Sequence, residues 1–232
     1  MHANNEIGTI QPIRLISEVC RDLGVLLHTD AAQSVGKIPT RVTDLGVDML
    51  SLAGHKMYAP KGVGALYVRQ GTRVEPVLHG AGHERGLRPG TENVSHIVAL
   101  GQAASVADRN LAEAGERMAI LRDRLENRLT DAMPKEFTIN GQRAERLPNT
   151  LSVNFPRANG GELLRRIPEL CASTGSACHS GSDNLSPTLA SLGLTPKVAA
   201  GTIRLSVGWY TSEEDVDRAA NLLLAAWEGV SR

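Results

Sequence analysis

The sequence predicts an α/β protein with a larger domain on a parallel sheet, residues 1–133, and a smaller α+β domain, residues 134–232. Two observations predict this arrangement. In the first part, apolar runs of strand length follow a helical segment, with connections long enough for crossovers. After Pro134, short strand and helix patterns alternate again. A chain of 232 residues, 41% of them hydrophobic, is long enough to bury a sizeable core in such domains.

The larger domain is expected to begin with a helix at residues 12–23, because apolar residues recur there at helical spacing. Pro12 suits its first turn and Gly24 its end. The predicted core face consists of Ile13, Ile16, Val19, Cys20 and Leu23. Strands are expected at residues 25–29, 47–52 and 62–69, and a long helix at residues 92–132.

The smaller domain is expected to contain three strands and three helices. The strand patterns lie at residues 137–140, 151–155 and 202–207, and the helical patterns at residues 161–167, 186–192 and 212–227. Ser212 is a suitable N-cap for the last helix, since acidic residues follow it in the first turn.

The charge balance excludes some functions. Lysine plus arginine and aspartate plus glutamate both number 25, so no overall field favours nucleic acid or an anionic membrane. No apolar run approaches the roughly 20 residues that span a bilayer, and the first residues resemble neither a signal nor a transit peptide. We therefore expect a soluble cytoplasmic protein. Three cysteines without CxxC spacing fit neither a disulfide framework nor a self-contained zinc site.

Four polar residues are expected to converge at one edge of the predicted sheet. Asp30 follows one buried strand, with Gln33 shortly after it, and His55 and Lys56 lie on the turn that leaves the next. Taken singly, a lysine after a strand is usually a solvated charge and an aspartate in a turn usually caps a helix. Together they supply what a pyridoxal phosphate site requires, an amine for covalent attachment, an acid for the pyridine nitrogen and neutral orienting donors.

Five separated motifs, which occur in the family's order, resemble the cysteine desulfurases of the class V aminotransferase group. They are HANNEIG at residues 2–8, HTDAAQSVGK at 28–37, SLAGHK at 51–56, RPGT at 88–91 and STGSAC at 173–178. The resemblance runs from the first residues to about Thr211. It implies pyridoxal phosphate fold type I with a partial large domain. In that family the first motif lies well inside the chain, so this sequence resembles the carboxy-terminal portion, without upstream phosphate contacts and a ring-stacking histidine.

The resemblance implies roles in binding pyridoxal 5'-phosphate. Lys56 would hold the cofactor and abstract the α proton of the substrate, Asp30 would keep the ring protonated, Gln33 would bond the phenolate oxygen, and His55 would contact the phosphate or ring. Thr91 would reach across a homodimer interface to the phosphate of the partner's cofactor. Ala53 departs from relatives with serine there, so one phosphate contact would be absent.

The resemblance also implies roles toward L-cysteine. Arg204, on a strand of mostly apolar residues, would clamp the α-carboxylate with help from Asn5, although a structural salt bridge is the commoner role for a buried arginine. Cys178, in a segment of small and polar residues, would attack the substrate sulfur, keep it as a persulfide and release alanine. The long loop after it resembles that of the group I members, which pass sulfur to iron-sulfur scaffold proteins.

Two other classes stay open. A selenocysteine lyase-like enzyme would share Asp30 and Lys56 but could release its product without Cys178. A catalytically incomplete fragment, acting only in dimerisation or partner binding, would take up no cofactor.

Overall fold

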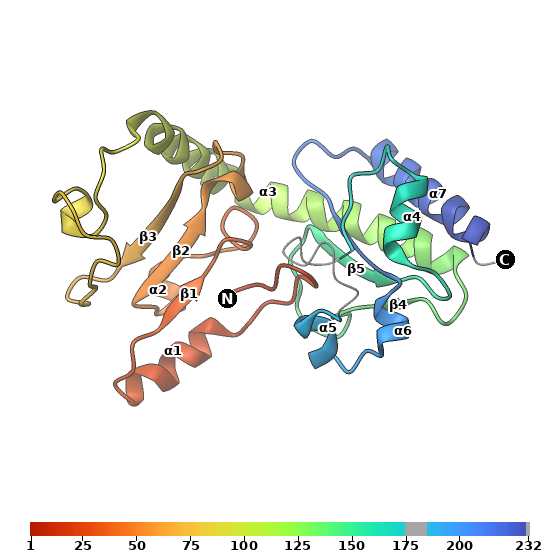
Figure 1. The fold of residues 1–232 in the computed structure, drawn as a ribbon, viewed down its shortest axis with the longest axis horizontal. Helices are drawn as coiled ribbons and strands as arrows, with labels where there is room; N and C mark the ends of the chain where they lie inside the picture. Colours follow the sequence, from red (N-terminus) through yellow and green to blue (C-terminus); the bar gives the residue numbers. More distant parts are fainter. Residues whose placement is uncertain (175–184, 231–232) are drawn as a thin grey trace. The chain divides into compact units, whose positions relative to one another are not determined.

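The computed structural model describes residues 1–174 and 185–230, which fall into two compact units (Figure 1). The first unit comprises Met1–His2 and Gln11–Leu111, and the second comprises Ala3–Ile10 and Ala112–Arg232. One long helix, α3 (Val94–Ala132), contributes residues to both. The expected domain boundary at residues 133/134 stays a prediction, since the units divide by contacts within α3.

The first unit contains a three-stranded sheet in the order β1-β2-β3. Its strands are β1 (His28–Asp30), β2 (Met49–Ala53) and β3 (Gly64–Val68). β1 and β2 are parallel, as predicted, whereas β3 is antiparallel to β2, so this sheet is mixed. The reason is the short connection from β2 to β3, whose only helix is a single turn of 3₁₀ helix, η1 (Gly54–Met57). A parallel return needs a crossover of about a dozen residues or more.

β1 is shorter than the predicted strand at residues 25–29. The ladder with β2 begins at the pair His28 and Met49. Just before this pair, the Leu27 amide donates a hydrogen bond to the Asp48 carboxylate at 2.9 Å. This amide is therefore bonded to a side chain and not to the main chain of the neighbouring strand. Val25 and Leu26 are exposed.

The helix α1 (Ile13–Asp22) forms where predicted, but its predicted core face is wrong. Ile13 and Ser17 are the buried residues, Cys20 is half-buried, and Ile16, Val19 and Leu23 are exposed. Fewer residues of the helix are buried than the apolar pattern suggested, because only one side of α1 packs on the core of this unit. The core of this unit consists of Ile13, Ala31, Leu45, Val47 and Leu50.

The remaining elements of the first unit are short. They are α2 (Val42–Leu45) and the 3₁₀ turn η2 (Glu84–Gly86), which lies in the glycine-rich loop before α3.

The second unit contains an antiparallel sheet in the order β4-β5-β6, covered by helices. Its strands are β4 (Thr138–Ile139), β5 (Thr150–Asn154) and β6 (Thr202–Ser206). Its helices are α4 (Gly160–Arg166), α5 (Pro187–Ser191), α6 (Pro196–Ala199) and α7 (Glu213–Val230). The strands and helices expected here all occur, and α6 is an additional turn. Ser212 caps α7 as predicted, since its hydroxyl accepts a hydrogen bond from the Asp215 amide at 3.1 Å.

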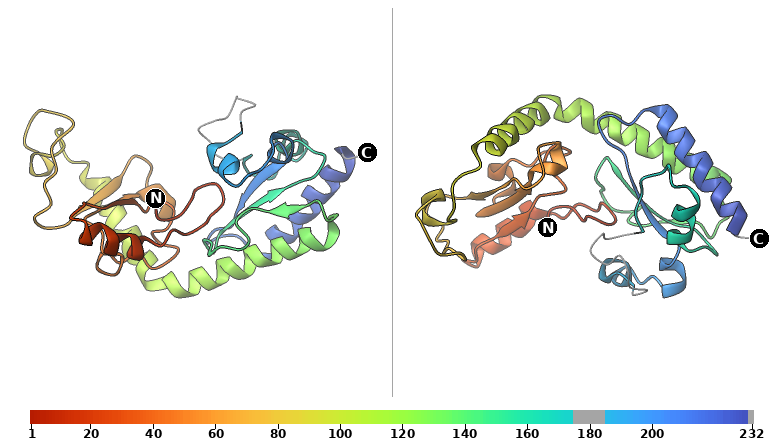
Figure 2. Two further views of the ribbon diagram at one scale, coloured as in Figure 1. Left: turned by 90° about the horizontal axis from the view of Figure 1, so that it is seen from below. Right: turned by 45° about the horizontal axis from the view of Figure 1, so that its top comes forward.

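The core of the second unit lies between its sheet and two long helices. Figure 2 shows α7 running alongside the later part of α3, and the Arg124 guanidinium pairs with both carboxylate oxygens of Asp217 at 2.8 Å. The core residues include Leu121, Leu125 and Leu129 from α3, Leu151 and Val153 from β5, Ile203 from β6, and Val216 and Leu223 from α7. Within the two described ranges, no helix combines the length and apolarity that a bilayer crossing needs.

A buried polar network ties the strands of the second unit together. The Asn154 side chain, 2% exposed, accepts hydrogen bonds from Asn140 at 3.0 Å and Thr202 at 2.6 Å. It donates to Asn140 at 2.8 Å and to Thr138 at 2.9 Å. Buried amides are tolerated when all their donors and acceptors are paired, and this one is.

We expect Asn154→Ala to lower the free energy of unfolding by about 3 kcal/mol, because it leaves several buried partners unsatisfied at once. Urea unfolding of the variant and of the parent chain measures this loss. The control is Asn127→Ala, which removes an exposed amide from α3 and is expected to change stability by less than about 0.5 kcal/mol. Equal midpoints for the two variants would contradict the assignment of the network as stabilising.

Candidate functional site

The first unit brings three of the predicted site residues to one edge of its sheet. Asp30 is the last residue of β1, and β2 runs directly into η1, which carries His55 and Lys56. The two strands are parallel, with Asp30 paired to Ser51, so both end at the same edge. The carboxyl edge of parallel strands is where ligands bind in open α/β sheets.

A close main-chain contact fixes the start of η1. A Cβ at Gly54 would lie 2.9 Å from the Val63 carbonyl oxygen, so only glycine fits there. The Gly54 amide donates to the same carbonyl at 2.9 Å. Tyr58 ends the turn in the left-handed conformation, at φ 66°. Lys56 is thus carried on a main chain held at both ends.

The Asp30 carboxylate is half-buried and held by its own turn. Its Oδ1 accepts a hydrogen bond from the Ala32 amide at 2.8 Å, and Oδ2 has no partner among the residues that the structure describes. The Asp30 carbonyl accepts from the His2 amide at 2.7 Å. One carboxylate oxygen therefore fixes the side chain, and the second remains able to bind a ligand.

The Lys56 amine makes no hydrogen bond or ion pair in the described part of the chain, and both Lys56 and His55 are exposed. The expected cleft around the amine is therefore not formed by the described residues. Gln33 is half-buried in the turn that follows β1. Thr91 is exposed in the loop between η2 and α3.

The donor set at this edge fits pyridoxal phosphate. It offers a primary amine with no carboxylate bound to it, a carboxylate with one oxygen to spare, the Gln33 amide and the His55 imidazole. These are the groups needed to bind the aldehyde carbon, protonate the pyridine nitrogen and orient the phenolate. Asp30, Gln33, His55 and Lys56 are thus the residues of this unit that could hold the cofactor.

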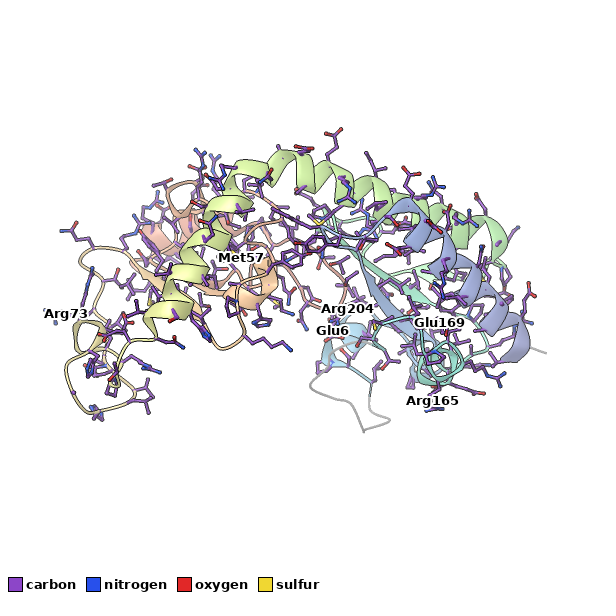
Figure 3. All side chains as sticks on the ribbon, turned by 90° about the horizontal axis from the view of Figure 1, so that it is seen from above. Glu6, Met57, Arg73, Arg165, Glu169 and Arg204 are labelled. Atoms are coloured by element: carbon purple, nitrogen blue, oxygen red, sulfur yellow. The ribbon has the colours of Figure 1, made fainter. Side chains whose placement is uncertain are left out.

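The second unit brings Asn5 and Arg204 together. Residues 3–10 form a closed loop in which the Asn4 side chain accepts from the Glu6 amide at 2.8 Å and the Ile7 amide at 3.0 Å. Arg204, on β6, donates from Nη1 to the Asn5 carbonyl at 2.9 Å. Figure 3 labels Arg204 and Glu6 in this part of the molecule.

The Arg204 guanidinium is half-buried and has no carboxylate within ion-pair distance among residues 1–174 and 185–230. The structural salt bridge that was the alternative role is therefore not formed within those ranges. A guanidinium held by one main-chain carbonyl keeps further donors for a planar anion.

Glu6, which is buried, and Lys37, which is half-buried, are charged residues to which the sequence assigned no role. The Glu6 carboxylate, 6% exposed, accepts from the Ser186 hydroxyl at 2.5 Å, at the start of α5. Lys37 lies in the same motif as Asp30 and Gln33. Its position four residues after Gln33 is the sequence feature that could have indicated a role at the same site. Cys178 lies outside the described residues.

The comparisons with known proteins agree on one family. The model of the aminotransferase class-V family matches residues 1–219. A curated relative, "Cysteine desulfurase IscS" of Histophilus somni strain 2336, is 46% identical over 228 residues, which are 97% of this chain and 56% of the relative. The chain thus spans little more than half the length of that relative.

Solved structures resemble the chain over nearly its whole length. A NifS-like protein from Rickettsia africae superposes with a TM-score of 0.89 at 27% identity, covering 98% of this chain and 60% of that one. The structure titled "SspA in complex with cysteine" has a TM-score of 0.73 at 37% identity, covering 91% and 58%. These similarities confirm the predicted fold class, a partial α/β domain of fold type I with a smaller α+β domain.

Proposed function

This chain belongs to the class V aminotransferase family, and from that premise we propose that it is a pyridoxal phosphate-dependent cysteine desulfurase. It would convert L-cysteine to L-alanine and keep the sulfur as a persulfide on Cys178. The observation that carries the proposal is the placement of Asp30 and Lys56 at the ends of adjacent parallel strands, with no carboxylate of the described residues paired to the amine. The similarity to curated cysteine desulfurases supports the reaction class.

When bound, the cofactor supplies an electron-accepting ring next to the α carbon of the amino acid. The chain's own residues hold and orient that ring. Asp30 would keep a proton on the pyridine nitrogen, Gln33 would donate to the phenolate, and His55 would contact the phosphate or ring. Thr91 would contact the phosphate of the cofactor in the partner subunit. Lys56 would provide the covalent attachment and serve as the base for the α proton.

The remaining residues act on the substrate. Arg204 would bind the α-carboxylate through the guanidinium donors that the Asn5 carbonyl does not occupy. Asn5 would assist in binding the same carboxylate. The Cys178 thiolate forms a bond to the substrate sulfur while the carbon–sulfur bond of L-cysteine breaks. The electron pair of the broken bond stays with the substrate carbon, which takes up the proton that Cys178 lost on ionising, and the α carbon regains its proton from Lys56. L-alanine then leaves, and the sulfur remains on Cys178 as a persulfide.

Partners and location follow the same proposal. The active form is a homodimer, since Thr91 serves the partner's cofactor, and the persulfide passes to a sulfur acceptor protein such as an iron-sulfur scaffold. The support for the acceptor is the similarity to relatives named IscS. We also propose a cytoplasmic location, consistent with the free thiols of Cys20 and Cys171.

The test is uptake of pyridoxal phosphate by the purified chain, followed by the same measurement on Asp30→Ala. The parent chain is expected to show an absorbance band near ~420 nm that borohydride fixes to Lys56. Asp30→Ala is expected to keep covalent attachment but to lose about 100-fold or more in cysteine turnover, because the ring is no longer held protonated. The control is Asp44→Ala, an exposed aspartate of α2, which is expected to behave as the parent.

A catalytically incomplete fragment is the second candidate, and the exposure of Lys56 favours it. A parent chain that takes up no cofactor at saturating concentration would overturn the desulfurase proposal for this chain and support dimerisation or partner binding alone.

A further inference from the structure

Lys37 is a cation of the first unit, and the proposed function does not explain its placement. Its Nζ donates to the Gln33 carbonyl at 3.0 Å. No carboxylate lies within ion-pair distance of it in the described ranges. Partial burial, together with the charge of Lys56, lowers the pKa of Lys37 to about 8. The half-buried side chain is thus held at a cost to its charged form.

Two contacts hold the turn that carries Lys37 in place. Gly36, at φ 76°, packs so closely that an added Cβ would lie 3.3 Å from the Cβ of Met57, the residue after Lys56 (Figure 3 labels Met57). In the same turn, the Ser34 hydroxyl lies 2.9 Å from Nδ1 of His2 and donates to the Ala31 carbonyl at 3.2 Å. The turn from Ala31 to Lys37 is therefore packed against η1.

Stability alone does not account for a lysine here. A methionine of similar length would fill the same space without desolvating an ammonium, and one hydrogen bond to a main-chain carbonyl does not neutralise that charge. Ionisable groups with a shifted pKa and no opposite charge to pair with concentrate at functional sites. The ligand expected at this edge carries a phenolate and a phosphate, which are the charges that a half-buried ammonium would attract.

We propose that Lys37 is a positioning residue of this site, whose amine fixes the Gln33 main chain and adds positive charge beside Lys56 for an anionic, phosphate-bearing cofactor. This inference rests on the proposed function. In this proposal Lys37 acts by holding the Gln33 main chain and by its positive charge, and it forms no covalent bond itself.

Three variants test the proposal, Lys37→Met, Lys37→Arg and the control Lys135→Met, which removes an exposed lysine of the second unit. The probe is pyridoxal 5'-phosphate, titrated by its absorbance into the full chain. Lys37→Met is expected to weaken binding by about 10- to 100-fold, the loss typical of one charge-assisted hydrogen bond. Lys37→Arg keeps the charge and is expected to bind within about threefold of the parent.

A second readout needs no cofactor. Hydrogen exchange of the Val35, Lys37 and Ile38 amides, which bond to Ala31 and Ser34, is expected to quicken in Lys37→Met and not in Lys135→Met. Together the two readouts separate the possible failures. If the parent binds the cofactor and Lys37→Met binds it as tightly, the Lys37 proposal is overturned while the proposed function stands. If the parent binds none, both are overturned.

Discussion

Lys56→Ala is expected to abolish covalent retention of pyridoxal phosphate and to lower L-cysteine turnover by about 1,000-fold or more, because one side chain supplies both the attachment and the base. The reason is local to η1. The Lys56 amine has no hydrogen bond or ion pair in the described part of the chain, so its removal breaks no polar contact there. The variant should therefore fold as the parent does.

The measurement is borohydride reduction in the presence of cofactor, followed by mass spectrometry of the peptide at residues 51–61, with alanine release measured in parallel. Lys61→Ala is the matched control, since Lys61 is also exposed and lies five residues further along the chain. Turnover of cysteine by Lys56→Ala at the parent rate would show that this lysine is not the attachment site.

Cys178→Ser is expected to remove the enzyme-bound persulfide completely and to lower alanine release by about 100-fold or more, because a hydroxyl is not a nucleophile toward sulfur at neutral pH. Its cofactor spectrum is expected to match that of the parent. Alkylation of the persulfide after a single addition of L-cysteine, followed by mass spectrometry, measures the loss. Cys171→Ser is the control, since Cys171 is an exposed free thiol in the same unit.

The two variants separate the reaction classes. Sulfide release that is unchanged in Cys178→Ser but absent in Lys56→Ala would favour a selenocysteine lyase-like reaction over cysteine desulfuration. Loss of activity in both variants, with covalent retention of the cofactor lost only in Lys56→Ala, is the result that cysteine desulfuration requires.

Much of the local structure could be predicted because it depends on short stretches of sequence. The capping of α7 by Ser212 involves residues three apart in the chain. The apolar runs at β2, β5 and β6 were found within one or two residues of their ends, since strand patterns need only a few alternating or apolar positions.

The errors arose where burial or pairing depends on distant residues. The apolar face of α1 was assigned to the core, yet Ile16, Val19 and Leu23 are exposed. Helical periodicity shows which residues share one face of a helix, but it does not show whether another element packs against that face. The direction of β3 was likewise not in its own sequence, because it follows from the short connection through η1.

The sequence by itself determined which reactive groups the chain carries and at which strand ends Asp30 and Lys56 stand. Only the tertiary structure decided that Arg204 meets the carbonyl of Asn5, 199 residues away, and that Lys37 is half-buried with the charge of Lys56 nearby. The physical reason is that hydrogen-bonding and apolar patterns are read within a few residues, whereas burial and electrostatic neighbours are set by how distant segments pack.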